Sequence, residues 1–157
     1  MQQDATNNDP GVDICKAIVE QTPEAIIFSD REGAIRLWNV GAEFMFGHMA
    51  ADVMGKSLDV IIPERLQRAH WDGFNRAMET GVAKYVHKVL TTRSMHKNGT
   101  KLYVDLSFVL LRDRGGQVVG ALAVGRDCTS RQASDSALRA RVAELEKDVA
   151  QNAKGAQ

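Results

Sequence analysis

One histidine occupies a position where its chemistry could be used. In residues 64–80, Leu66, His70, Phe74 and Met78 recur every four residues. This spacing predicts a helix whose apolar, buried face includes His70. Because burying an imidazole without a partner is costly, the side chain should meet a hydrogen-bonding group or a bound metal inside the protein. His70 is therefore the first candidate for a binding residue.

The other residues with reactive side chains are scattered. His48, His87 and His96 share no short metal-ligand spacing. Cys15 and Cys128 lie far apart and match no metal or redox pattern, which is typical of two reduced thiols in a cytosolic protein. No nucleophile elbow or pair of carboxylates supports catalysis. The sequence therefore predicts a protein that is not an enzyme.

Composition excludes several classes of partner. Among 157 residues, 20 are basic (Lys and Arg) and 20 are acidic, so the formal net charge is zero and there is no electrostatic footprint for nucleic acid. No apolar run approaches the roughly 20 residues that cross a bilayer. Residues 1–10 are polar and lack the features of a signal peptide. We therefore expect a cytoplasmic protein that binds neither nucleic acid nor membrane.

Hydrophobic periodicity predicts the elements that would position His70. The first half should hold two short strands and several helices: a helix between Asp13 and Pro23, strands at 25–30 and 34–39, helices at 39–47 and 50–54, and the helix at 64–80. The second half should hold three longer strands: 82–96, 101–111 and 118–124. Lys97-Asn98-Gly99 is a strong hairpin signal between the first two of these.

From residue 130 the pattern changes to a charged helix reaching about residue 152. Its apolar residues are spaced four, three and four apart: Leu138, Val142, Leu145 and Val149. This is a coiled-coil seam, but two heptads are too short to be stable alone. The seam needs a partner, either a second copy in a homodimer or the protein's own sheet. The expected organisation is a flexible lead (1–12), a globular domain (13–129), a signalling and dimerisation helix (130–152) and a tail (153–157).

Four segments carry a resemblance to a known family. They are Pro23 to Ile27 with Asp30 to Gly33, Leu37 to Glu43 (LWNVGAE) with Phe46-Gly47, Lys97 to Thr100 (KNGT), and Val124 to Arg131 (VGRDCTSR). In this order and spacing they resemble the PAS domain family over about residues 14–131. The resemblance implies an α+β PAS fold, with a five-stranded antiparallel sheet and short helices over one face enclosing a ligand cavity.

The resemblance also implies a function. PAS domains sense a small ligand, a cofactor, light or redox state, or they simply dimerise, and they pass a signal through the exit helix. Asp127 and Thr129 match an Asp-x-Thr junction whose polar contacts couple that helix to the sheet. The effector, such as a kinase, cyclase or regulator, would be a separate protein or a part removed from the chain. The class that forms a flavin photoadduct needs an Asn-Cys-Arg motif, and neither cysteine has that context.

The stretch Ile62 to Gly81 is similar to the haem helix of oxygen-sensing PAS kinases. His70 falls on their proximal ligand to the iron of haem b, and Arg76 falls on an arginine that pairs with a haem propionate. Leu90 falls where these sensors carry a distal arginine. The remaining pocket residues under this reading are Phe74, Leu106 and Phe108, the last two forming an apolar distal wall.

Three alternatives remain open at this point. PAS domains without haem carry a similar helix, in which the histidine bonds to backbone or water. The chain would then either sense another ligand in the same cavity, or be a dimerisation adaptor whose cavity is collapsed or lipid-sized. A small enzyme of the cystatin-like or hot-dog type would need a polar pair inside the sheet, for which Tyr103, Asp105 and Ser107 are the candidates. These alternate with Leu102, Val104 and Leu106, so we expect them to face solvent or a partner.

Overall fold

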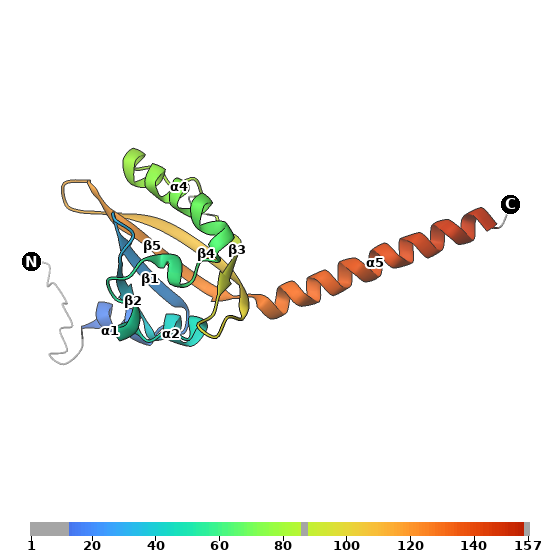
Figure 1. Ribbon diagram of the computed structural model, residues 1–157, viewed down its shortest axis with the longest axis horizontal. Coiled ribbons are helices and arrows are strands. Elements are labelled where there is room, and N and C mark those ends of the chain that lie inside the picture. The colour runs from blue at the N-terminus through green and yellow to red at the C-terminus, as the bar shows by residue number, and fades with distance from the viewer. Residues whose placement is uncertain (1–12, 86–87, 156–157) are drawn as a thin grey trace, which may run out of the picture.

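The computed structural model describes residues 13–85 and 88–155. Its described strands form one antiparallel sheet in the order β2-β1-β5-β4-β3 (Figure 1). The strands are β1 (Ala25–Asp30), β2 (Ile35–Trp38), β3 (Leu90–Met95), β4 (Lys101–Arg112) and β5 (Val118–Asp127). The helices are α1 (Ile14–Gln21), α2 (Val40–Phe46), α3 (Ala50–Val53), the 3-10 turn η1 (Leu58–Val60), α4 (Glu64–Thr80) and α5 (Thr129–Gly155). The predicted fold class is confirmed.

The main core lies between one face of the sheet and the short helices. Successive strand residues point to opposite faces, so every second residue of β1 is buried on this side. The buried residues of the core come from β1, β2, β4 and the helical layer: Ala25, Ile27, Ile35, Trp38, Ala42, Phe46, Val53, Ile61, Leu102 and Val104. On β4 the even-numbered residues face this core, so Tyr103, Asp105 and Ser107 lie on the opposite face of the sheet. This side of the sheet is the one predicted for them.

Asn39 holds the first half of the domain together. Its Oδ1 accepts hydrogen bonds from the backbone N–H of Ala42, at 2.9 Å, and of Ile26, at 2.8 Å. Its Nδ2 donates to the carbonyls of Val19 and Glu24. The cap that the sequence predicts for α2 therefore also ties α1 and β1 together.

The predicted strand at 82–96 is wrong in its first half. β3 begins only at Leu90, and the described residues between Gly81 and Leu90 form no strand. Gly81 ends α4 in the left-handed conformation, with φ 68°, and its carbonyl accepts a hydrogen bond from Arg112 at 2.6 Å. The following residues must lead the chain from this point back to the sheet edge. β-branched residues favour a strand only where they can pack on a sheet, and Val82 and Val89 are instead exposed.

The last helix leaves the domain at the end of β5. α5 runs outward from the sheet as one long helix (Figure 1). Only its first turn contacts β4, and from Ala133 to Gln151 every side chain is exposed. The helix therefore does not pack along its own sheet. None of the described helices combines the length and apolarity needed to cross a membrane.

Candidate functional site

His70 lies on α4 with one nitrogen enclosed. Its ring stacks on Phe74 with centroids 6.1 Å apart and meets the edge of Trp71 at 5.0 Å. The Nε2 atom is buried and has no hydrogen-bond partner among the described residues. Native proteins seldom leave such an atom unpaired, so an orphaned buried nitrogen is a feature that asks for an explanation.

The electrostatic environment keeps His70 neutral. Burial lowers its pKa below the ordinary value of 6.5, and the Asp59 carboxylate offsets part of that effect. Asp59 is itself engaged, because its Oδ1 accepts a hydrogen bond from the Trp71 indole at 2.7 Å. A neutral imidazole with a free nitrogen is the form that binds metals.

Two arginines attach the far end of α4 to the sheet. Arg31, in the β1–β2 turn, donates to the carbonyl of Val118 at 2.8 Å and to that of Met78 at 3.2 Å. Arg112 holds the carbonyls of Gly81 and of the β4–β5 turn. Nothing in the local sequence pattern predicts either contact, since each joins segments far apart in the chain. They fix the position of α4 over β4 and β5.

The remaining residues predicted for a cofactor pocket lie on two elements. Phe74 is buried with Met78 and Val118, and β4 adds Leu110 to this cluster. Leu106 and Phe108 share the face of β4 with Leu110 and are half-buried, as is Leu90, which pairs with Leu106. Leu106 packs against the main core, whereas Leu110 is the residue of this face that packs against Phe74 and Met78.

Arg76 does not join this group. It is exposed, and helical spacing places it on the opposite side of α4 from Phe74 and Met78. Its assignment to a haem propionate stays a prediction.

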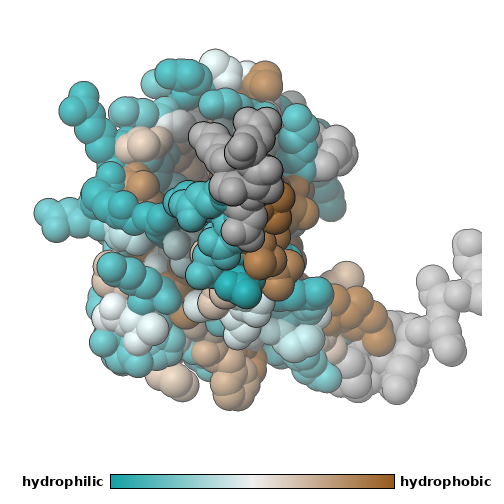
Figure 2. All heavy atoms as spheres, turned by 90° about the vertical axis from the view of Figure 1, so that its right-hand side faces the viewer, coloured by the Kyte–Doolittle hydropathy of each residue, from teal (hydrophilic) through white to brown (hydrophobic). Residues whose placement is uncertain are grey.

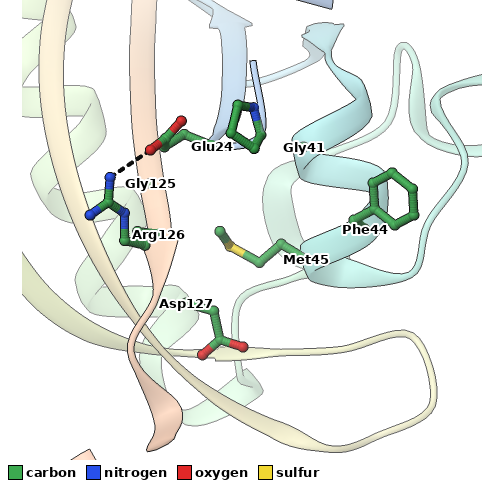
Figure 3. A pocket seen from close by; sticks show the side chains of 8 residues that line it. Glu24, Gly41, Phe44, Met45, Gly125, Arg126 and Asp127 are labelled. Atoms are coloured by element: carbon green, nitrogen blue, oxygen red, sulfur yellow. Dashed lines mark hydrogen bonds and ion pairs between the residues drawn. The ribbon is translucent and has the colours of Figure 1, made fainter. Parts of the chain in front are cut away.

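An open hollow of about 340 Å³ lies at the other end of the sheet, between α2 and the end of β5 (Figure 3). Met45 and Asp127 point into it, and the Glu24–Arg126 ion pair forms one side. Phe44, at its rim, is 84% exposed. This hollow does not include His70, so the two features are separate.

The junction between β5 and α5 is a network of short-range polar contacts. Asp127 Oδ1 accepts from the backbone N–H of Thr129 at 2.8 Å, and Thr129 Oγ1 accepts from the backbone N–H of Tyr103 at 2.9 Å. The Cys128 N–H donates to the Tyr103 carbonyl at 2.8 Å. The structure therefore brings Asp127 and Thr129 together and places Thr129 against β4.

Asp105 adds a side-chain anchor that sequence patterns did not reveal. It forms an ion pair with Arg131 at 2.7 Å and accepts hydrogen bonds from Thr91 and, at 3.5 Å, from the Cys128 thiol. Hydrogen bonds from Thr91 and Arg131 lower the pKa of Asp105. Burial, followed by the Asp105 hydrogen bond, raises the pKa of Cys128, which makes this thiol a poor nucleophile. Asp105 thus joins β3, β4 and α5, and its oxygens are committed to these structural contacts.

The predicted seam on α5 is open to solvent. Leu138, Val142, Leu145 and Val149 are between 46% and 71% exposed. A shallow groove of about 400 Å³ lies beside Val142, Leu145 and Val149 and is lined also by Glu146. In Figure 2, which looks toward the projecting end of α5, hydrophobic atoms lie on one side of the projecting helix, next to hydrophilic ones. This arrangement leaves an unpartnered apolar stripe.

The fold and these motifs agree with a comparison against known families. A family model described as the PAS fold matches residues 19–133, most of the chain. The chain belongs to the PAS family. Within the described residues, no three His, Cys, Asp or Glu side chains gather as they would around a metal ion.

Two curated relatives contain this PAS segment within longer proteins. An uncharacterized protein of Azorhizobium caulinodans is 28% identical over 124 residues, which span 78% of this chain and 17% of that protein. The sensor protein FixL of Bradyrhizobium diazoefficiens is 23% identical over 130 residues, 83% of this chain and 25% of that protein. The chain thus spans a quarter or less of the length of these relatives.

Solved structures show the same fold. The PAS domain of a Colwellia psychrerythraea protein superposes with a TM-score of 0.64 at 24% identity, covering 74% of this chain and 94% of that one. An RNA-binding light-oxygen-voltage receptor gives a TM-score of 0.69 at 19% identity, covering 91% of this chain and 40% of that one. At these identities the similarity shows the fold alone.

Proposed function

We propose that this PAS domain senses a small ligand or cofactor through His70 and transmits the signal through a dimeric α5. The orphaned Nε2 of His70 carries the proposal. A buried nitrogen without a partner lowers stability in the free protein, and a ligand that engages it would remove that cost. The similarity to a protein named as a sensor supports the same reading.

Haem b is the first cofactor to test. His70 would be the residue that holds the iron, since burial favours the neutral imidazole and Nε2 has no hydrogen-bond partner among the described residues. The cofactor would supply an iron whose ligation responds to a gas or to redox state. Phe74, Leu90, Leu106 and Phe108 would surround it with apolar contacts. Leu90 stands where the resemblance would put a distal arginine, and a leucine would offer no hydrogen bond to oxygen, so carbon monoxide, nitric oxide or redox state would be the expected signal.

The output runs through the β5–α5 junction. Asp127, Thr129 and the Asp105–Arg131 ion pair attach the first turn of α5 to the sheet. A shift of the sheet at this point would therefore move the helix. We assign no catalytic role to the chain, and the signal would pass to an effector such as a kinase, cyclase or regulator.

A ligand-free adaptor is the second candidate, and one observation favours it. The Nε2 atom of His70 is covered, and Phe74, Met78 and Val118 pack between α4 and the sheet. Any ligand must displace what covers that nitrogen. If nothing does, the domain is a filled scaffold that serves only to associate with a partner.

The visible absorption spectrum separates these candidates. Purified protein is measured as isolated and after addition of hemin, beside His70→Ala and the matched control His48→Ala, whose Nε2 is also buried and unpartnered. The sensor proposal expects a sharp Soret band that is lost or shifted in His70→Ala and kept in His48→Ala. Circular dichroism checks that both variants fold. A colourless protein, or equal hemin binding by all three, rules out haem at His70 and leaves the adaptor or a domain that binds an organic ligand.

A further inference from the structure

The apolar stripe on α5 has no partner among the described residues of its own domain. Leu138, Val142, Leu145 and Val149 stay exposed because the helix leaves the sheet after its first turn. An exposed continuous apolar stripe on a helix marks a site of association. Val142, Leu145 and Val149 line one shallow, open apolar surface, as residues of a coiled-coil seam do before a second helix packs on them.

The charges flanking the stripe have a definite order. Helical geometry places Arg139 and Glu146 along one edge of the stripe, and Arg141 and Asp148 along the other. Each edge therefore carries a basic residue followed seven residues later by an acidic one. When two copies of such an edge run in opposite directions, the basic residue of each lies opposite the acidic residue of the other. Arg141 also contacts Glu144 in the same helix at 2.6 Å, an exposed pair that can exchange partners.

We propose that two copies of this chain associate through α5 in the antiparallel orientation. In an antiparallel pair, each edge of one helix faces the same edge of the other. Arg139 then lies opposite Glu146 of the second copy, and Arg141 opposite Asp148. All four charges of each helix gain an opposite charge. The inference rests on the proposed dimer and adds its orientation.

Antiparallel pairing also suits the apolar residues. When the helices cross midway between Val142 and Leu145, each of these packs against the other type in the second copy. Leu138 then packs against Val149. Each pair of facing apolar residues therefore consists of one valine and one leucine. All the pairs then fill the same volume.

The parallel alternative satisfies fewer charges. In a parallel pair, the residue directly before a valine of the stripe faces the residue five places later in the other helix. Arg141, which precedes Val142, would therefore lie opposite Glu146 of the second copy. Arg139 would instead lie beside Ser134. Asp135, on the line of the stripe, would face the same carboxylate of the other copy, and like charges in contact oppose association. Arg131 cannot relieve this repulsion while it is paired with Asp105.

The orientation has a structural consequence for signalling. α5 has 27 residues, so it extends about 40 Å. Antiparallel pairing puts the two PAS domains at opposite ends of the helix pair. The carboxyl-terminal part of each helix then lies beside the first turns of the other. A movement of α5 at one β5–α5 junction would therefore reach the junction of the second copy directly.

Charge reversal at Arg139 tests the orientation. In the antiparallel pair, Arg139→Glu turns two attractions with Glu146 into repulsions, and we expect a dimer roughly 10-fold weaker by sedimentation equilibrium at low salt. The double variant Arg139→Glu with Glu146→Arg should restore the wild-type dissociation constant. In a parallel pair, position 139 faces Ser134, so an unchanged dissociation constant in Arg139→Glu overturns the proposal. A wild-type chain that is monomeric at all concentrations overturns the dimer itself, which is a distinct result.

Disulfide trapping gives an independent answer. Leu138→Cys and Val149→Cys are made separately in a Cys15→Ser background, in which the remaining Cys128 is buried. The antiparallel pair should cross-link only when the two variants are mixed. Self-cross-linking of each variant alone would show a parallel pair and refute the proposal.

Discussion

Replacing His70 by leucine should stabilise the free protein. The variant removes a buried nitrogen that has no hydrogen-bond partner in the described part of the chain and adds an apolar side chain beside Phe74 and Trp71. Leaving a buried polar group unsatisfied costs about 1–3 kcal/mol. Because the His70 ring as a whole is only half-buried, we take the lower end and expect a gain of about 1 kcal/mol at pH 7.5.

The pH dependence of this gain follows from the lowered pKa of His70. In the unfolded chain the imidazole has its ordinary pKa near 6.5, while in the folded chain burial lowers that pKa. Between the two values the unfolded state binds more protons, so stability falls as the pH drops below 6.5. One such group contributes a slope of at most about 1.4 kcal/mol per pH unit. The advantage of the leucine variant should therefore grow between pH 7.5 and 5.5.

Urea denaturation followed by tryptophan fluorescence measures the effect, since Trp71 lies against His70. The free energy of unfolding is compared for wild type, His70→Leu and His70→Gln at several pH values. Glutamine stays polar but does not titrate, so it should lose the pH dependence contributed by residue 70 without gaining stability. A leucine variant less stable than wild type at pH 7.5, or one with the same pH profile, would show that the imidazole is satisfied in solution and refute the reasoning.

Three further variants test the framework around the site. Asn39→Ala should lower the free energy of unfolding by about 2–4 kcal/mol, because it leaves two backbone N–H groups without their acceptor, as urea denaturation would show. Gly120→Ala should cost more than about 2 kcal/mol in the same assay, because a Cβ there would collide with the rigid Ser29 carbonyl, and a neutral result would mean that β1 and β5 can separate. Asp105→Asn should speed amide hydrogen exchange in the first turn of α5 by weakening its pairing with Arg131, and equal protection would contradict the anchoring role.

Sequence patterns predicted the elements of this fold where local chemistry decides them. The Asn39 cap, the glycine that ends α4 at position 81 and the hairpin at Lys97 to Thr100 all depend on neighbouring residues, and each occurs as expected. The strand predicted at 82–96 failed because β-branched residues favour a strand only when another strand is available to pair. Whether a strand is available to residues 82–89 depends on where they start, and Arg112 fixes that point through its hydrogen bond to the Gly81 carbonyl.

The candidate site was predicted less completely. Periodicity placed His70 on the inner side of α4, but it could not show that Nε2 would lack a partner, because that depends on atoms from several elements. The Asp105–Arg131 ion pair was not predicted either. It joins residues 26 positions apart whose proximity arises only when β5 and the start of α5 lie beside β4.

Whether a ligand can reach the covered Nε2 of His70 decides between a sensor and an adaptor. A ligand that reaches it must first displace packed side chains, so its affinity is reduced by the fraction of molecules already open. The unpaired nitrogen works in the opposite direction, because it raises the free energy of the closed state and so lowers the cost of opening. A sensor requires a residue that raises the free energy of the closed domain and loses this cost only when a ligand binds to it. An adaptor would be better served by leucine at this position, so the stability of His70→Leu and the hemin spectrum address the same question from opposite sides.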